Sequence, residues 1–400
     1  MTNGTVTGPQ GFLAAGLASG VKVSGKPDLG LLVCPTGAVA AAVFTTNKIT
    51  SAAVQVSREH VASRKTCAVV VNSGNANACT GKLGLTNARR MCALTAKHLG
   101  VQPEEVLVAS TGIIGHQLPM EKVTAGIDQA APLLSGSTEA GLAFAHAIMT
   151  TDTRCKQAYR EVKLSRATAK IAGTVKGAGM IGPNMATTLL FITTDVAISK
   201  AMLGKALTQA IGGSLNRLTV DGHQSTNDTG ILLASGLAGN ERITGPGAGY
   251  QKFASALTDL CTDLVRQMAL DAEGATRMFQ VVVKGAASTA EATKAARAVA
   301  DYPLFKCAVN GGDPNWGRII CAVGSSGVKL KPDKLSCKLD DLYVFRKGAP
   351  TDFDPKEASQ IISQRQFVIT VDLGIGRGSD FYYGCDLSTE YVHINADYHT

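Results

Sequence analysis

Apolar and polar residues follow two kinds of pattern along the chain. Short runs rich in valine, isoleucine and alanine predict strands, because such side chains suit a buried sheet. Longer stretches, in which apolar residues recur three and four positions apart, predict helices. The expected strands are 30–34, 38–45, 67–72, 106–110, 170–175, 189–195, 230–234, 277–284, 317–323 and 366–371, and the expected helices are 86–99, 119–134, 138–149, 200–211, 249–270 and 289–300.

The interleaving of these strands and helices indicates a mixed α/β fold, with layered sheets favoured over a barrel. A chain of 400 residues exceeds the usual span of one hydrophobic core, so we expect two domains, or one large layered domain with an appendage. No internal repeat at solenoid periods is visible.

The composition is that of an ordinary globular protein, with 45% hydrophobic and 18% charged residues. The net charge is +8, but the basic residues are dispersed and lack interleaved aromatic side chains. We therefore expect no nucleic-acid partner. A mild positive field suits small anionic substrates instead, because it steers them toward a cleft.

The ten cysteines include no CxxC pair and no repeating spacing, so neither a metal site nor a disulfide framework is indicated. The first residues lack the basic and apolar segments of an export signal. No apolar run is long enough to cross a bilayer. These observations predict a cytoplasmic protein without a membrane partner.

The most unusual stretch is a glycine-rich loop that begins at Lys176 and runs through Thr187 and Thr188 into the apolar strand 189–192. A hydroxyl is thereby placed at the start of a strand, as an N-terminal nucleophile requires. The Thr187 hydroxyl can attack the carbonyl of Ala186, and hydrolysis of the resulting ester would leave a free amine on Thr187. Chain-terminal amines ordinarily have a pKa of about 7.7 to 8.0, so this amine can serve as the base without a histidine.

The loop by itself is weak evidence, because glycine-rich turns before strands are common. A phosphate-binding function is disfavoured, since Gly177, Gly179 and Gly182 fit neither GxGxxG nor GxxxxGK[ST] and a strand follows.

Several further stretches, taken with this loop, carry a resemblance that covers nearly the whole chain. They are Val71-Asn-Ser-Gly-Asn-Ala-Asn-Ala, Ser110-Thr-Gly-Ile-Ile-Gly, Met149-Thr-Thr-Asp-Thr, Asp271-Ala-Glu-Gly-Ala-Thr, Asn310-Gly-Gly-Asp-Pro-Asn-Trp-Gly-Arg and Tyr391 to Thr400. In order and spacing they resemble the ornithine acetyltransferase family, also called glutamate N-acetyltransferase, whose members cleave themselves before the threonine at the end of the loop.

The resemblance implies a role for each matching residue. Thr187 is the nucleophile, the cleaved bond joins Ala186 to Thr187, and Thr111 and Gly112 form the oxyanion hole. The implied substrate-binding residues are Thr150, Lys176, Thr187, Glu273, Asn395 and Thr400. In this scheme Lys176 pairs with a substrate carboxylate and Glu273 with the δ-ammonium of ornithine. The stretch from Asn310 to Arg318 is expected to be a rigid turn cluster without a chemical role.

The reaction implied by the resemblance is ping-pong transfer of acetyl from N-acetylornithine to glutamate, without a cofactor or metal. Whether acetyl-CoA is a second donor stays open. The implied fold is a layered αββα core over 1–280, similar to N-terminal nucleophile hydrolases but differently connected, with a smaller α/β domain over 281–400. Cleavage gives fragments 1–186 and 187–400, assembled as two copies of each.

Two departures from the family pattern leave alternatives open. Thr188 stands where members often carry methionine, so it is a second candidate nucleophile. The other is Arg154-Cys155, which follows the Met149-Thr-Thr-Asp-Thr stretch where family members commonly carry a proline before the lysine. We expect this change to affect loop packing only. Two other functions also remain: an aminopeptidase or amidase on the related fold, in which water resolves the acyl-enzyme, and a binding protein that keeps the fold but no longer cleaves itself.

Overall fold

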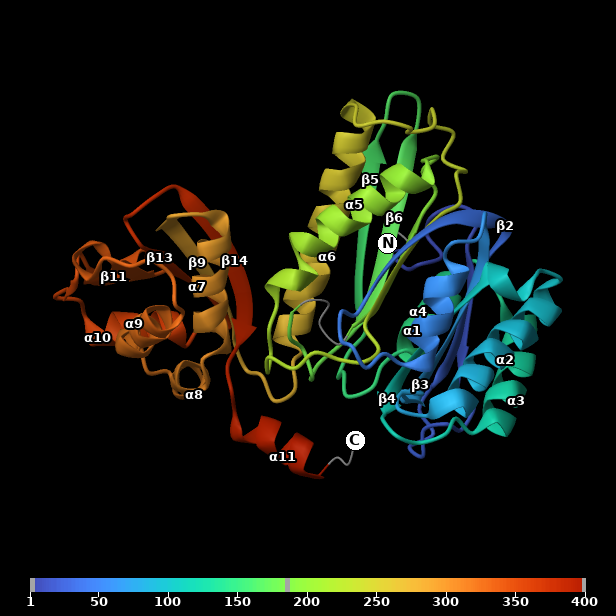
Figure 1. Ribbon diagram of the computed structural model, residues 1–400, viewed down its shortest axis with the longest axis horizontal. Coiled ribbons are helices and arrows are strands. Elements are labelled where there is room, and N and C mark those ends of the chain that lie inside the picture. Colours follow the sequence, from blue (N-terminus) through green and yellow to red (C-terminus); the bar gives the residue numbers. More distant parts are fainter. Residues whose placement is uncertain (1–3, 184–187, 398–400) are drawn as a thin grey trace.

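The computed structural model describes residues 4–183 and 188–397, which form a mixed α/β fold (Figure 1). Its first sheet has the strand order β4-β3-β2-β8-β7-β6-β5, with β1 added alongside β2. These strands are β1 (Leu13–Leu17), β2 (Leu29–Phe44), β3 (Thr66–Asn75), β4 (Val106–Ile113), β5 (Lys156–Lys163), β6 (Thr168–Lys176), β7 (Leu189–Thr194) and β8 (Thr229–Ala234).

Strand β2 belongs to both halves of this sheet. Its first part pairs with β3 and its second part with β8, and the pairing with β3 shifts register between Val33 and Ala38. A register shift bends a strand, and the two halves of the sheet face each other across a shared core. Phe144 and Phe191 meet edge to face in that core, with ring centroids 5.3 Å apart.

Helices cover the outer face of each half of the sheet. Side chains alternate along the strands, so that Val71 lies in the core between the halves while its neighbour Val70 packs under the helices. Helices α1 to α3 cover the β2–β4 half, and α5 and α6 cover the β5–β8 half. The helices are α1 (Ala52–His60), α2 (Gly81–Leu99), α3 (Met120–Ala130), α4 (Thr138–Ala147), α5 (Lys200–Gly212) and α6 (Ala248–Leu270).

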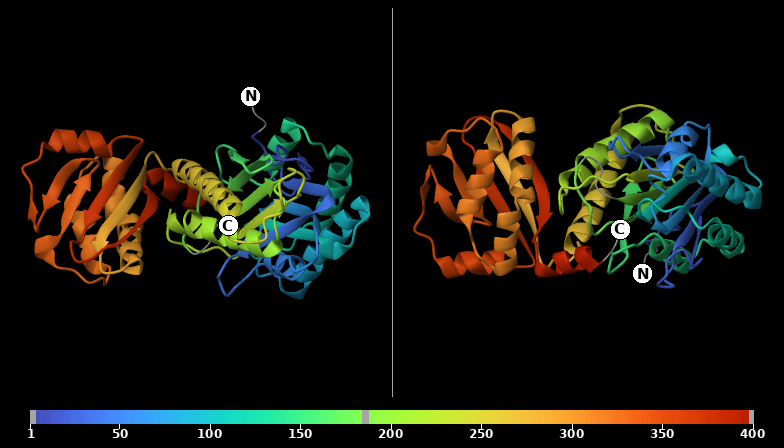
Figure 2. Two further views of the ribbon diagram at one scale, coloured as in Figure 1. Left: turned by 90° about the horizontal axis from the view of Figure 1, so that it is seen from above. Right: turned by 60° about the horizontal axis from the view of Figure 1, so that its bottom comes forward.

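A second sheet, with the order β12-β11-β10-β13-β9-β14, forms a separate C-terminal domain (Figures 1 and 2). Its strands are β9 (Met278–Ala286), β10 (Ser336–Leu339), β11 (Leu342–Arg346), β12 (Ala349–Pro350), β13 (Gln366–Asp372) and β14 (Gly378–Cys385). Its helices are α7 (Thr289–Asp301), α8 (Pro303–Gly311), α9 (Trp316–Ser325) and α10 (Pro355–Ile362), and short 3-10 turns lie at Pro103–Glu105, Ala131–Leu133, Leu215–Arg217 and Pro332–Lys334.

The last helix, α11 (Thr389–Asp397), leaves the C-terminal domain and returns toward the first sheet (Figure 2). The two parts of the molecule also touch directly, because Arg217 forms an ion pair of 2.8 Å with Asp380 and the amide of Thr219 donates to the carbonyl of Tyr383. Across 4–183 and 188–397, no helix combines the length and apolar character needed to span a bilayer.

The predicted fold class, a layered αββα arrangement with a further α/β part, is confirmed. The strand predicted over 317–323 is wrong, because this stretch is helix α9. The Asn315 side chain caps the helix by accepting the amide of Arg318, and Ile319, Ala322 and Val323 are buried at helical spacing. The expected turn cluster 310–318 therefore ends inside a helix. The separate strands 30–34 and 38–45 are one strand, β2.

Candidate active site

The glycine-rich loop after β6 is held by carboxylates from other parts of the chain. The amide of Gly177 donates to Asp152 Oδ1 at 2.8 Å. Further along, Asp221 accepts the amides of Met180 and Ile181, at 2.7 and 2.9 Å. Charged acceptors make strong hydrogen bonds to backbone N–H groups. The path of the chain ahead of the proposed cleavage point is therefore fixed at its start and in its middle.

Ala186, Thr187 and Thr400, all candidates from the sequence, lie outside the described residues. Thr188 is the first described residue after the loop. Its amide donates to Asp228 Oδ1 at 2.9 Å, and its carbonyl accepts the amide of Thr229 at 2.9 Å. The peptide next to Thr187 is thus held on its C-terminal side, at the start of β7.

Asp228 is fully buried, yet only one of its carboxyl oxygens has a partner in the described part of the chain. Oδ1 accepts the Thr188 amide, whereas Oδ2 has no hydrogen bond, and neither has the buried hydroxyl of Thr188. Burial raises the pKa of the Asp228 carboxyl well above its ordinary value, against the opposing effects of the Thr188 amide, the Lys176 charge and the Thr45 hydroxyl.

Thr111 and Gly112 lie near the end of β4, opposite Ser73 and Gly74 of β3. Gly112 has φ +130°, and a Cβ at this position would lie 2.3 Å from the carbonyl carbon of Gly74. Only glycine fits such an approach. Gly112, close to the end of β4, therefore presents its backbone without a side chain of its own.

Asn227 connects the end of β4 to Thr188, the residue directly before β7. Its Nδ2 donates to the carbonyls of Ser110 and Ala76, at 2.7 and 2.6 Å. The next residue, Asp228, holds the Thr188 amide. Two consecutive residues thus bring the end of β4 and the start of β7 together, although they belong to different halves of the sheet.

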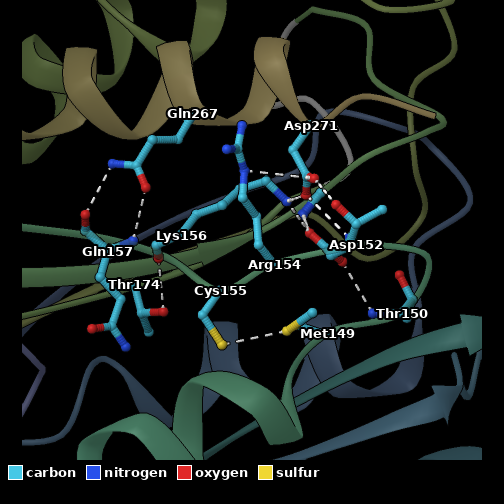
Figure 3. A network of polar contacts seen from close by, with 12 residues as sticks. Met149, Thr150, Asp152, Arg154, Cys155, Lys156, Gln157, Thr174, Gln267 and Asp271 are labelled. Carbon is cyan, nitrogen blue, oxygen red and sulfur yellow. Dashed lines mark hydrogen bonds and ion pairs between the residues drawn. The ribbon is translucent and has the colours of Figure 1, made fainter. Parts of the chain in front are cut away.

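Beside the loop lies a buried ionic cluster of Asp152, Lys156 and Asp271 (Figure 3). The Lys156 ammonium is inaccessible to solvent and lies 2.5 Å from Asp152 Oδ1 and 2.5 Å from Asp271 Oδ2. Burial alone would raise the pKa of Asp152, but the Lys156 and Lys176 charges lower it to about 2. Asp152 Oδ2 also accepts the amide of Thr150 at 3.0 Å, so one carboxylate orders both Thr150 and the loop.

Lys176 ends β6 and is 3% exposed. Its ammonium has no hydrogen bond or ion pair within the described residues. Burial lowers its pKa, and Lys156 adds to this effect, whereas Asp152 and Glu273 oppose it. A buried ammonium with unused donors is costly unless a ligand pairs with it, so Lys176 is suited to receive an anion.

Glu273 and Asn395 form a hydrogen bond beside the middle of the loop, at Gly179. The amide of Glu273 donates to the carbonyl of Ala178 at 2.9 Å, and the Glu273 carboxylate packs so closely against Gly179 that a Cβ there would lie 2.2 Å from Oε2. Asn395 Nδ2 donates to Glu273 Oε2 at 2.9 Å. Helix α11 is therefore anchored at the loop through its own side chain.

A cavity of about 420 Å³ lies beside Thr150. It is lined on one side by the loop 21–26 and on the other by Gly74, Ile113 and Thr150. Thr150 is the predicted binding residue that faces this space. No cluster of histidine, cysteine and carboxylate side chains suited to a metal occurs in the described ranges.

The structure thus connects the described candidates Thr111, Gly112, Thr150, Lys176, Glu273 and Asn395 through the loop and its carboxylates. Sequence reasoning missed the three aspartates that hold this arrangement, which are Asp152, Asp221 and Asp228. Asp152 lies within the recognised stretch Met149-Thr-Thr-Asp-Thr, which is the one available signal. The other two are single acids among small and polar residues, without a distinctive pattern.

Comparison with known proteins gives consistent matches along the chain. The model of the ArgJ family matches residues 13–400. An arginine biosynthesis bifunctional protein ArgJ of Symbiobacterium thermophilum is 46% identical over 399 residues, which cover 99% of both chains. The protein of the same name from Dehalococcoides mccartyi is 44% identical over 100% of this chain and 98% of its own. A crystal structure of ArgJ from Bacillus halodurans is 40% identical with a TM-score of 0.51, over 52% of this chain and 98% of that one.

Proposed function

Because this chain belongs to the ArgJ family of arginine biosynthesis, we propose that it is a glutamate N-acetyltransferase that moves acetyl from N-acetylornithine to glutamate. The observation that carries the proposal is the meeting of opposite charges at one loop. Lys176 lies at the head of the glycine-rich loop without a hydrogen-bond partner in the described chain, and Glu273 packs against the middle of that loop. N-acetylornithine carries a carboxylate and an ammonium, which suit this pair.

The enzyme matures by cleaving itself between Ala186 and Thr187. Support comes from the hydrogen bonds on both sides of this bond, in which Asp221 accepts the amide of Met180 in the loop ahead and Asp228 accepts the amide of Thr188. The match to the Bacillus halodurans structure also fits, because nearly all of that solved chain corresponds to 52% of this one. Residues 187–400 make up a similar share.

In the mature enzyme, the Thr187 hydroxyl attacks the acetyl carbon of N-acetylornithine and its own α-amine takes the proton. The carbon–nitrogen bond of the amide then breaks, and ornithine leaves with that proton. Glutamate attacks the resulting ester in the reverse sense and leaves as N-acetylglutamate. Thr111 and Gly112 donate to the oxyanion in both steps, an effect typically worth roughly 3 to 4 kcal/mol per donor.

Incubation with N-acetylornithine labelled in its acetyl group tests the proposal. With glutamate present, the label should move to N-acetylglutamate, while without glutamate it should stay on the protein, on the fragment that begins at residue 187. Release of acetate at a rate independent of glutamate would instead identify an amidase. A lasting single chain of 41.4 kDa would contradict self-cleavage.

Matched variants locate the nucleophile. Thr187→Ala should abolish both cleavage and turnover, whereas Thr188→Ala should retain them. The opposite result would move the nucleophile to Thr188.

The same proposal extends to assembly, location and donor. Two copies of each fragment form the enzyme, which works in the cytoplasm, and sedimentation of the purified protein measures the assembly directly. The relatives are named bifunctional, which supports a trial of acetyl-CoA as a second donor in the same assay.

A further inference from the structure

The loop between β1 and β2 packs against Gly74 of β3, which in turn packs against Gly112 of the proposed oxyanion hole. The buried carboxylate of Asp28 gathers this loop, since its oxygens accept the amide and hydroxyl of Ser19, at 2.6 and 2.7 Å, and the amide of Lys22 at 2.8 Å. The carbonyl of Asp28 accepts the amide of Ser73 from β3 at 2.8 Å. The loop is therefore attached to β3, the strand that pairs with the end of β4.

Lys22 crosses from this loop toward the predicted binding residue Thr150. Its stem lies against Gly74, where a Cβ would come within 2.8 Å of Lys22 Cγ, and Gly74 in turn packs on Gly112. Its ammonium donates to the carbonyl of Pro27 at 2.6 Å and to that of Met149 at 2.7 Å. An ammonium has three N–H groups, so one remains without a partner in the described part of the molecule.

This remaining donor belongs to a residue that lines the cavity of about 420 Å³ beside Thr150. The charged groups that face Lys22 are Asp28, Lys176, Asp152 and Lys26. Both carboxylates are engaged elsewhere, Asp28 with its own loop and Asp152 with Lys156 and Gly177. Lys22 and Lys176 thus bring two positive charges to one region, and among the described residues neither carboxylate that faces Lys22 is left free to neutralise it.

We propose that Lys22 is a specificity-determining residue, which together with Lys176 binds the carboxylate common to N-acetylornithine and glutamate. This inference rests on the proposed function and adds a residue to it. The hydrogen bonds to the carbonyls of Pro27 and Met149 hold the Lys22 ammonium beside Thr150. Its third N–H is then free to donate to the substrate carboxylate.

The titration of Lys22 separates this role from a structural one. Burial lowers the pKa of Lys22 to about 8, and the Lys176 charge adds to the effect while Asp28 and Asp152 oppose it. Above that pH the neutral amine keeps two N–H groups, enough for the carbonyls of Pro27 and Met149, but it loses its charge and its third donor. The loop therefore stays in place while attraction for a carboxylate is lost.

The experiment measures KM and kcat for N-acetylornithine between about pH 6.5 and 9.5, a range that brackets this pKa, at saturating glutamate, in wild type, Lys22→Met and Lys22→Arg. In wild type, KM should rise above about pH 8. Lys22→Met should raise KM by at least about tenfold at pH 7, as expected for loss of a charge-assisted hydrogen bond, with kcat within about twofold and no further rise above pH 8. Lys22→Arg should keep KM low across the range, because its guanidinium stays charged.

Lys122→Met is the matched control. The Lys122 ammonium also holds this loop, by donating to the carbonyl of Gly20 at 2.8 Å, but Lys122 does not line the cavity. Its variant should leave KM and its pH dependence unchanged. Equal effects of Lys22→Met and Lys122→Met, or an unchanged KM in Lys22→Met, would overturn the proposal.

Two further measurements keep the test decisive. If Lys22→Met fails to fold, the wild-type pH profile and Lys22→Arg still decide, since a flat wild-type KM contradicts the proposal. If wild type transfers no acetyl, the proposed function fails by itself. Calorimetric binding of N-acetylornithine to wild type and Lys22→Arg, at pH 7 and pH 9, then tests the carboxylate site without turnover, and pH-independent wild-type binding would contradict it.

Discussion

Asp152 and Asp228 are both buried carboxylates beside the glycine-rich loop, but their surroundings are opposite. Asp152 accepts from the Lys156 ammonium and from the amides of Gly177 and Thr150, and these interactions with the Lys176 charge lower its pKa to about 2. Asp228 accepts one amide, that of Thr188, and its second oxygen has no partner among the described residues. The pKa of Asp228 is raised well above its ordinary value.

The difference shows that burial alone does not decide the state of an acid. A full set of donors keeps Asp152 ionised, so its charge serves the architecture of the loop. Asp228 has too few donors for an ionised group and keeps an unused oxygen next to the residue after the proposed nucleophile. We call the Asp152 side of the loop saturated, because both oxygens of this carboxylate accept hydrogen bonds. We call the Asp228 side incomplete, because one of its oxygens has no partner among the described residues, close to the proposed cleavage point.

The largest expected effect comes from removing the cation of the saturated side. Lys156→Met leaves Asp152 and Asp271 buried without their shared partner, which should lower the free energy of unfolding by about 3 to 5 kcal/mol. Urea denaturation monitored by circular dichroism measures it. Arg89→Ala, which breaks an exposed pair with Glu59, is the control and should cost under about 1 kcal/mol. A similar cost for both variants would mean that the buried cluster is not the anchor described above.

The incomplete side should respond in the rate of self-cleavage. Asp228→Ala removes the acceptor of the Thr188 amide, and loss of alignment at a reacting bond should slow cleavage on the order of 100-fold. Asp228→Asn retains an acceptor oxygen and should slow it far less. Gel electrophoresis of freshly translated protein over time gives the rates. Cleavage at the wild-type rate in Asp228→Ala would show that this contact does not position the bond.

Asp152 and Asp228 should have opposite effects on how the stability of the protein changes with pH. The pKa of Asp152 is lowered to about 2, so its contribution is complete above its unfolded value of about 3.9 and is lost as the pH falls toward 2. Burial raises the pKa of Asp228, so the folded state keeps this proton to higher pH than the unfolded state does. Stability therefore falls with rising pH above about 4, by up to about 1.4 kcal/mol per pH unit.

Asp228→Asn removes that second dependence, so its stability relative to wild type should increase as the pH rises above the unfolded value of about 3.9. Thermal melts across this range measure the difference. A constant difference would mean that Asp228 is ionised in the folded protein, and the contrast with Asp152 would disappear.

The smallest expected effect concerns Glu273, a carboxylate of intermediate exposure that accepts from Asn395. Asn395→Ala removes two hydrogen bonds at an exposed position, to Glu273 and to the carbonyl of Tyr391 in the same helix, each worth about 0.5 to 1.5 kcal/mol. It should raise KM for N-acetylornithine by roughly three- to tenfold with unchanged unfolding. If the free energy of unfolding falls by as much as the change in KM corresponds to, Asn395 stabilises the fold, as Asp152 does, and does not act on substrate binding.

The sequence predicts the layered fold well, because its strands and helices have buried faces of clear periodicity. The prediction of a strand over 317–323 is wrong because a short apolar stretch fits the spacing of a strand as well as that of a helix. The Asn315 cap favours the helix. The candidates Thr111, Lys176 and Glu273 come from recognisable stretches. Lys22 does not, because its role depends on a contact with Met149, 127 positions away, which no local pattern reveals.

The strand order of the first sheet has a consequence for the cleaved protein. Strands β7 and β8 follow residue 187, whereas their outer neighbours β6 and β2 precede it. The second fragment is thus interleaved with the first, with paired backbone on both of its sides. If the chain is cleaved as proposed, dilution should not separate the two fragments without unfolding them, and refolding from separated fragments should be a bimolecular process whose rate depends on concentration.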